Sequence, residues 1–265
     1  MEIPVQERMI NSPSVTFETK CWEGDWEFLL KTRRLERMIA RNNFPFAERI
    51  LFINNVRDGA KVRAYAEKLV KANVLTDFCL VEDHAREALD FFQLSRDSLG
   101  RGYVYSISEL VSIYRCDTEF LLHFSGDAIP AATSDWVVDA LEQFEMNGRV
   151  RVANPVWNHR LGEARRSSFD ENDKFFIGSG FSDQCYLVRA ADFQAPIYNE
   201  THADSARYPQ YGGELFEKRV DSWLRNHDYH RITYKHCAYV HRNFPKNALR
   251  KWLKLLLHRL KPAYR

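Results

Sequence analysis

The stretch from Glu119 to Ala131, Glu-Phe-Leu-Leu-His-Phe-Ser-Gly-Asp-Ala-Ile-Pro-Ala, determines how the chain is interpreted. Its apolar residues, 120–124, predict a short, fully buried strand that stops at Ser125-Gly126-Asp127. In open α/β sheets, ligands bind where the strands end at their carboxyl termini. A carboxylate at such an end, beside a glycine that permits close backbone approach, is well placed to hold a cation. The alternative is that Asp127 only shapes a turn, as Gly-Asp pairs often do.

Length and composition indicate a globular α/β protein. The chain has 265 residues, of which 45% are hydrophobic and 28% charged, so a sizeable core can form. The aromatic content of 14% is high, and aromatic faces often line sugar or base sites. No linker divides the chain, which predicts one domain over 14–241 and a separate tail over 242–265.

Charge is unevenly distributed between these two parts. Of the 38 Lys and Arg residues, eight lie in the tail, which has no Asp or Glu, leaving 30 basic residues against all 36 acidic residues in the rest. Such asymmetry indicates a polyanionic surface as partner of the tail. Nucleic acid is a poor candidate, because the body is acidic and carries no nucleic-acid-binding motif.

The tail predicts a basic amphipathic helix. Its apolar residues recur at helical spacing between the basic ones, at Leu249, Trp252, Leu253, Leu256 and Leu260. We expect this helix to lie on an anionic membrane surface; the alternative is that it packs on the domain. Residues 1–14 contain no apolar signal segment, and the five cysteines lack metal-site spacing, which predicts a cytoplasmic, reduced protein, peripheral on the inner face of the membrane.

Strand and helix patterns alternate along the first half, as in parallel βαβ units. We expect strands over 14–18, 49–53, 77–82, 120–124, 150–155, 184–188 and 239–241, and helices over 25–43, 60–72, 84–94, 106–116, 135–146 and 214–226. Polar loops are expected over 19–25, 95–102, 159–174 and 199–213. Ser106 and Glu109 have the spacing of a capping box, which assigns Glu109 to a helix start.

Four segments together resemble a GT-A glycosyltransferase of the family 2 type. Ser14-Val-Thr-Phe-Glu-Thr-Lys-Cys is similar to that family's first strand and loop, and Ile50-Leu-Phe-Ile-Asn-Asn to its second strand, which ends in Asp-Asp. Phe120-Leu-Leu-His-Phe-Ser-Gly-Asp resembles the strand that ends in the Asp-x-Asp metal motif. Gly212-Gly-Glu-Leu-Phe-Glu-Lys-Arg resembles the helix start that carries the catalytic base. The resemblance implies a mostly parallel, Rossmann-like sheet flanked by helices.

Three positions depart from the family pattern. Ser125 replaces the first Asp of Asp-x-Asp, Asn54-Asn55 replaces Asp-Asp, and Glu18 replaces the proline after the first strand. Only Asp127 of the motif therefore remains to meet a metal.

The resemblance implies roles for particular residues. Asp127 would ligate Mn²⁺ or Mg²⁺ with His241 as a second ligand, and His236 is a weaker rival. The nucleotide would be bound by residues at neighbouring strand ends, namely Glu18, Thr19, Asn54, Asn55 and Ser125; Asn54-Asn55 could equally be a turn.

The acceptor hydroxyl needs a base. Glu214, expected at a helix start, is the predicted catalytic base, with Glu217 and Asp183 as alternatives. Asp183 could instead face the acceptor.

The resemblance thus implies a metal-assisted, hexosyltransferase-type enzyme that moves a sugar from a nucleotide-diphosphate sugar to a glycan or lipid-linked acceptor, with inversion of the anomeric centre. Two other hypotheses stay open. One is a nucleotidyltransferase, which would want a glycine-rich basic first loop that 18–24 lacks. The other is a non-catalytic module that binds sugar nucleotide or glycan, which the loss of one Asp favours slightly.

Overall fold

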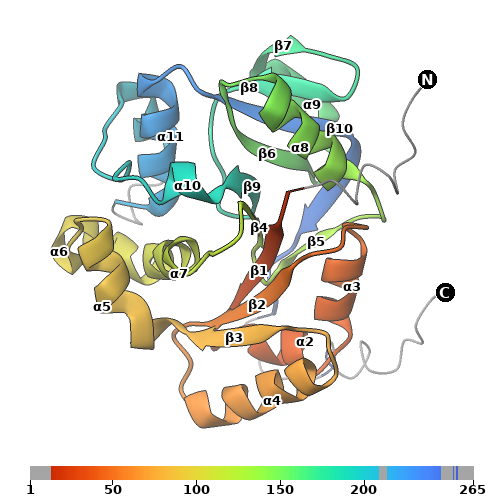
Figure 1. The fold of residues 1–265 in the computed structure, drawn as a ribbon, viewed down its shortest axis with the longest axis vertical. Coiled ribbons are helices and arrows are strands. Elements are labelled where there is room, and N and C mark those ends of the chain that lie inside the picture. Colours follow the sequence, from red (N-terminus) through yellow and green to blue (C-terminus); the bar gives the residue numbers. More distant parts are fainter. Residues whose placement is uncertain (1–12, 209–213, 246–252, 254, 256–265) are drawn as a thin grey trace.

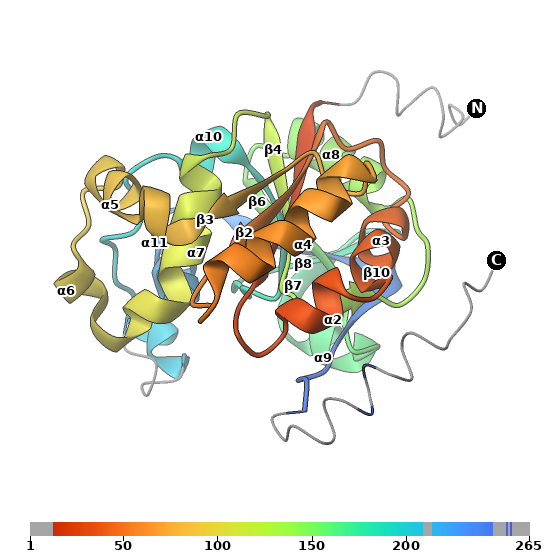
Figure 2. The same ribbon diagram turned by 90° about the horizontal axis from the view of Figure 1, so that it is seen from below.

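A computed structural model describes residues 13–208, 214–245, 253 and 255. Its described part contains one ten-stranded sheet in the order β3-β2-β1-β4-β9-β6-β10-β8-β7, with β5 paired to β10. Helices cover both faces of this sheet (Figures 1 and 2). Strands from the two halves of the chain are therefore joined edge to edge in a single sheet.

The first half forms the parallel part of the sheet. Its strands are β1 (Val15–Cys21), β2 (Glu48–Ile53), β3 (Asp77–Leu80) and β4 (Phe120–Phe124). β1 lies between β2 and β4 and is parallel to both. All five residues of β4 are buried, and its bounds are those that the apolar run predicts.

The second half adds strands of both directions. They are β5 (Ala128–Pro130), β6 (Val150–Trp157), β7 (Ser168–Glu171), β8 (Phe175–Gly178), β9 (Cys185–Arg189) and β10 (His230–His241). β9 is antiparallel to both β4 and β6, and β10 is parallel to β6. β4, β6 and β10 consequently point the same way and end at the same edge of the sheet.

The helices form two layers on the opposite faces of the sheet. α2 (Trp26–Leu30), α3 (Arg34–Ala40), α4 (Gly59–Lys71) and α8 (Trp136–Met146) contribute to one core cluster with β1, β2 and β4. α5 (Val81–Phe91), α6 (Arg96–Leu99), α7 (Tyr103–Tyr114), α10 (Ala190–Phe193) and α11 (Phe216–Asn226) pack into two further clusters. Figure 2 shows the sheet passing between the two groups. α9 (Leu161–Arg166) lies beside β7.

Several expected boundaries are wrong. The single helix expected over 25–43 is two helices, α2 and α3, separated at 31–33. β1 continues through Cys21, so part of the loop expected over 19–25 is strand. The loop expected over 159–174 contains α9 and β7, because short, charged, partly exposed elements lack the apolar periodicity that marks buried ones.

The capping box expected at Ser106 is also wrong. α7 begins at Tyr103, which places Ser106 and Glu109 inside a helix whose residues 106–113 are all buried. The Ser106 hydroxyl accepts a hydrogen bond from the backbone N–H of Phe216 instead. Glu109 is therefore not a cap, and its carboxylate lies in the interior.

The predicted amphipathic helix of the tail lies almost wholly outside the described residues. Within the part of the chain that the structure describes, no helix has the length and apolar character needed to cross a bilayer. All five cysteines are buried and free of disulfides.

Gly126 is required by the turn that follows β4. A Cβ atom at this position would lie 2.8 Å from the carbonyl oxygen of Lys20 and 2.8 Å from the carboxylate of Asp25. Because one of these atoms is backbone, relief would require β1 and the turn to separate. The glycine thus permits the close approach of two strand ends.

We expect Gly126→Ala to lower the free energy of unfolding by about 1–3 kcal/mol, the usual cost of overpacking. Gly148→Ala is the matched control, because a Cβ atom there meets nothing within 4 Å. Urea denaturation of both variants measures the difference, and equal stabilities would show that the turn adapts freely.

Candidate functional site

A cavity of about 610 Å³ opens at the edge of the sheet where β1 and β4 end. Its walls come from segments far apart in sequence: the end of β1, the turn after β4, α7, the segment before β9 and the end of β10. Parallel alignment of β1, β4 and β10 brings their carboxyl ends together here. This is the edge at which α/β sheets bind their ligands.

Asp127 and His241 meet at this cavity. The Oδ2 atom of Asp127 lies 3.1 Å from Nε2 of His241, and the hydroxyl of Ser125 donates to Oδ1 of Asp127 at 3.0 Å. Burial raises the pKa of Asp127, but the hydrogen bonds from His241 and Ser125 outweigh it, so the pKa is lower than usual. The pKa of His241 is raised, chiefly by its hydrogen bond to Asp127. The pair therefore behaves as an ion pair.

Arg34 fixes the turn that carries Asp127. Its Nε donates to the carbonyl oxygen of Gly126 at 3.0 Å and its Nη2 to that of Ala128 at 3.1 Å. Both carbonyls that flank Asp127 are thus held by one guanidinium. This restricts the turn and adds positive charge behind the carboxylate.

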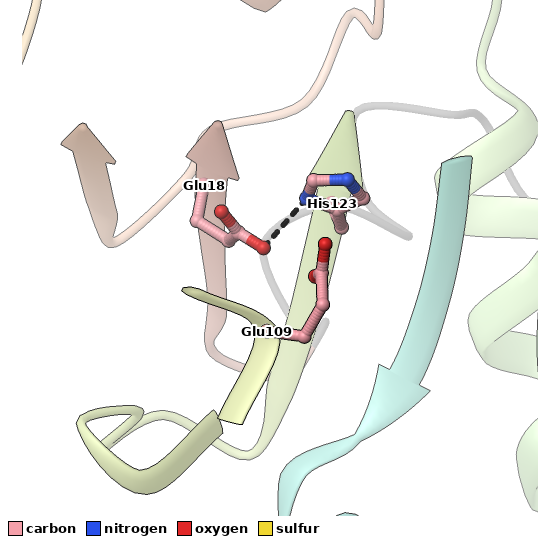
Figure 3. A group of neighbouring side chains, drawn as sticks. All are labelled: Glu18, Glu109 and His123. Atoms are coloured by element: carbon pink, nitrogen blue, oxygen red, sulfur yellow. Dashed lines mark hydrogen bonds and ion pairs between the residues drawn. The ribbon is translucent and has the colours of Figure 1, made fainter. Parts of the chain in front are cut away.

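A buried charge cluster forms the floor of the cavity. Glu18 of β1, His123 of β4 and Glu109 of α7 converge on one point, as Figure 3 shows. His123 Nδ1 lies 2.6 Å from Glu18 Oε1, and Lys20 Nζ lies 3.1 Å from both of these atoms and also pairs with Glu109. Although burial raises the pKa of Glu18, His123 and Lys20 hold it below its usual value. The ammonium of Lys20 therefore already supplies the positive charge that a metal would bring to these ligands.

Two further carboxyl groups lie next to the cavity. Burial and the charge of Glu109 raise the pKa of Asp183 to about 6. Burial and the charge of Asp183 raise the pKa of Glu217 to about 8. Both groups therefore retain a proton to higher pH than ordinary carboxyl groups do.

The outer walls carry aromatic and amide groups. Trp22 and Tyr105, with 53% and 59% of their surface exposed, line the cavity together with Asn54 and Asn55. Asn55 has a positive φ of 49°, as the turn interpretation of this pair requires, and its amide nitrogen donates to the carbonyl oxygen of Val104. Exposed aromatic rings beside amide groups are suited to hold a nucleobase or a sugar.

The structure brings together some of the predicted site residues. Asp127, His241, Ser125, Asp183, Asn54 and Asn55 all line the cavity. Glu18 and Thr19 lie within β1 rather than on a loop, and both are fully buried. The hydroxyl of Thr19 donates to the carbonyl oxygen of Phe124, and Glu18 lies in the floor cluster, so neither side chain reaches the cavity.

Glu214 is misplaced by the sequence analysis. α11 begins at Phe216 with Leu215 as N-cap, so Glu214 precedes the helix instead of opening it. Its carboxylate pairs with Lys218 at 2.6 Å and does not line the cavity. His236, the rival metal ligand, is exposed and lies 3.2 Å from the carbonyl oxygen of Asp173, away from Asp127.

Sequence reasoning missed Lys20, Trp22, Tyr105 and Glu109 as cavity residues. Lys20 and Trp22 adjoin the predicted first-strand motif, so position alone could have suggested them. Tyr105 and Glu109 belong to α7, whose contact with β1 and β4 is long-range. No local pattern indicates that contact.

Comparison with solved structures identifies the fold. A mannosyltransferase from Pyrobaculum calidifontis, in complex with GDP-Man and Mn²⁺, matches 94% of this chain with a TM-score of 0.52 and 15% identity. S. aureus TarS matches 92% with a TM-score of 0.51 and 14% identity, and GalNAc-T7, crystallised with UDP, GalNAc and Mn²⁺, matches 93% with a TM-score of 0.55 and 9% identity. The predicted GT-A glycosyltransferase fold is therefore confirmed.

The matched proteins are longer than this chain, which covers 62%, 38% and 48% of their respective lengths. No protein-family model matches the sequence, and no curated protein is detectably similar to it. The comparisons thus define the fold.

The raised pKa of Glu217 predicts a pH-dependent stability. The folded protein keeps a proton on Glu217 up to about pH 8, whereas the unfolded chain releases it near pH 4.5, so rising pH across this interval destabilises the fold. Gln does not titrate. We therefore expect Glu217→Gln to melt at least about 2 °C above the parent at pH 8, with the difference shrinking toward pH 5.

Thermal denaturation at both pH values measures this effect. Glu214→Gln is the control, because Glu214 is paired with Lys218 at the surface. A Glu217→Gln difference that stays constant with pH would show that Glu217 titrates normally.

Proposed function

We propose that the protein is a glycosyltransferase, of the hexosyltransferase type and family 2-like, that uses a nucleotide-diphosphate sugar as donor. The observation that carries the proposal is the Asp127–His241 pair, which lies at the carboxyl end of β4 in a cavity of a GT-A fold. Two structures with the same fold support it: one is named a mannosyltransferase and contains GDP-Man, the other contains UDP and GalNAc, and both contain Mn²⁺.

The donor atoms of the pair fit a divalent ion. Their separation of 3.1 Å is close to the distance of about 3 Å between neighbouring ligands of an octahedral ion with bonds of about 2.1 Å. Mn²⁺ accepts both carboxylate and imidazole, whereas Mg²⁺ prefers oxygen alone, so this set favours Mn²⁺. Such an ion, when bound, stabilises the negative charge that builds up on the diphosphate as the sugar leaves.

The protein's own groups account for the other needs of the donor. Lys20 lines the cavity, where its ammonium keeps the Glu18 and Glu109 carboxylates below the expected diphosphate neutralised. Trp22 and Tyr105 offer ring faces for the base, and Asn54 and Asn55 offer amide donors and acceptors for its edge. Ser125 holds Asp127 in place through its hydroxyl instead of supplying a second carboxylate.

Asp183 replaces Glu214 as the proposed catalytic base. It lines the cavity, and its raised pKa makes it a better proton acceptor than an ordinary carboxylate. In an inverting reaction, the acceptor hydroxyl attacks the anomeric carbon, the bond from that carbon to the phosphate oxygen breaks, Asp183 takes the hydroxyl proton, and the nucleoside diphosphate leaves.

The proposal also covers the class of acceptor and the cellular location of the protein. We propose a glycan or lipid-linked acceptor and a cytoplasmic protein that reaches the inner face of the membrane through its basic tail. The other two hypotheses are separated from this one by experiment. A non-catalytic module would bind the nucleotide sugar without turnover, and a nucleotidyltransferase would release pyrophosphate.

Metal-dependent nucleotide binding tests the donor site. We expect one nucleoside diphosphate from a panel to raise the melting temperature of the parent in the presence of Mn²⁺, and we expect Asp127→Asn to reduce this shift by more than half. Asp228→Asn, which removes a surface carboxylate, should respond like the parent. A shift that is unchanged in Asp127→Asn would remove Asp127 from the metal site.

Measurements of kcat test whether Asp183 is the catalytic base. We expect Asp183→Asn to lower kcat by about 100-fold to 10,000-fold while nucleotide binding is retained. In the parent, kcat should fall as pH drops through about 6, because Asp183 becomes protonated. Glu214→Gln tests the other candidate base. If Glu214→Gln loses activity while Asp183→Asn stays active, Glu214 and not Asp183 is the catalytic base.

A further inference from the structure

A second, smaller cavity of about 280 Å³ lies between β6, β10 and α9. Gln184 lines both this cavity and the larger one, and Ser182 lines the smaller one. Asp183, between these two residues, therefore stands at the boundary of the two cavities. The smaller cavity is just below the size of typical small-molecule sites, which start at about 300 Å³, so it suits one small unit.

Arg231 of β10 lines this cavity, and no carboxylate of the described residues pairs with it directly. Its guanidinium makes no hydrogen bond or ion pair with any of them, and its Nε is shielded from solvent. The nearby acid, Asp221, is fully buried and already accepts hydrogen bonds from Ser205, Arg207 and Arg225. No protein carboxylate of this region is left for Arg231.

The other charged residues of the cavity neutralise each other. Arg160 donates to Glu163 at 3.1 Å and stacks on the ring of Trp157 at 4.3 Å. The indole N–H of Trp157 is buried and has no acceptor among the described residues. The cavity thus presents one uncompensated positive charge and at least one further unused donor.

A guanidinium that is partly shielded from solvent and has no partner is destabilising, and an arginine cannot escape the cost by losing its proton. A carboxylate or phosphate accepts two parallel hydrogen bonds from a guanidinium and cancels its charge. An anionic group of a ligand would therefore supply what the described residues do not. The donor diphosphate is not the expected ligand of this cavity, because it is expected in the larger cavity, which Asp127, His241 and Lys20 line.

We infer that the smaller cavity is the acceptor site and that it takes an acceptor bearing a carboxylate or phosphate group, which Arg231 binds. The acceptor role rests on the proposed transferase function, whereas the anion site is inferred independently of it. With the anionic group on Arg231, a hydroxyl of the same small molecule can reach toward Asp183 at the boundary between the cavities. Arg231 would then set the specificity for charged over neutral acceptors.

The first experiment measures anion binding without any turnover. Inorganic phosphate is titrated into the full-length parent, Arg231→Gln and Arg165→Gln, and binding is followed by calorimetry. Arg165 is the matched control, because it is a largely exposed arginine of α9 outside both cavities. We expect parent and control to bind phosphate alike and Arg231→Gln to bind it at least tenfold more weakly. Equal binding by all three, or none by the parent, would overturn the inference.

The folding of the variant is checked in the same samples. Since Arg231→Gln removes an unpaired, half-buried charge, its melting temperature without phosphate should equal or exceed that of the parent. A lower value would indicate that Arg231 stabilises the fold through its own contacts, against the inference.

The second experiment compares acceptors. With the nucleotide sugar that binds best, nucleoside diphosphate release is measured with a hexose, the same hexose as its 6-phosphate, and the corresponding hexuronic acid. We expect the two charged acceptors to be used at least tenfold more efficiently by the parent and by Arg165→Gln, and the advantage to be lost in Arg231→Gln. Equal use of neutral and charged acceptors would overturn the acceptor assignment.

Failure of the transferase proposal and failure of the anion-site inference give different experimental results. If no nucleotide sugar binds or turns over while phosphate binding still depends on Arg231, the transferase proposal fails and the anion site stands. If nucleotide sugars turn over but phosphate binding ignores Arg231, the transferase stands and the anion site fails.

Discussion

The candidate site depends on the register between β5 and β10. In this antiparallel pair His241 lies opposite Ala128, the residue after Asp127. Because side chains alternate between the two faces of a strand, a shift of one residue would turn His241 to the other face and separate it from Asp127. The bulge that interrupts the β6–β10 pairing between Tyr234 and Ala238 contributes to this register. A pairing of residues 114 positions apart thus places the two atoms best suited to hold a metal.

Two cationic side chains that line the cavities differ in whether the chain itself pairs them with carboxylates. Lys20 lies among Glu18, Glu109 and His123, so the chain itself neutralises it and joins β1, β4 and α7 below the larger cavity. Arg231 lines the smaller cavity and has no such partner among the described residues. Breaking the first arrangement would leave buried charges unpaired, at a cost of about 3–5 kcal/mol. The second arrangement leaves a half-buried charge unpaired, and a bound anion would pair with it.

Asp183 connects the two cavities in the proposed chemistry. It lines the larger cavity, its neighbours Ser182 and Gln184 line the smaller one, and its raised pKa follows from burial beside Glu109. Proton transfer, donor binding and acceptor binding would all meet within the segment that precedes β9. This segment adjoins the turn after β4, because β9 runs antiparallel to β4 and begins where β4 ends.

The sequence alone determined the elements whose pattern is local and strongly apolar. The run 120–124 and the turn at Ser125-Gly126-Asp127 gave β4 and its turn, because four of the five strand residues are large and apolar. The resemblance of four segments to known transferases gave the GT-A fold. The tertiary structure alone decided the start of α7, the burial of Glu18 and Glu109, the exclusion of Glu214 from the cavity and the isolation of Arg231. Each of these depends on which distant segment faces a polar side chain, and that pairing is set by packing of the whole sheet.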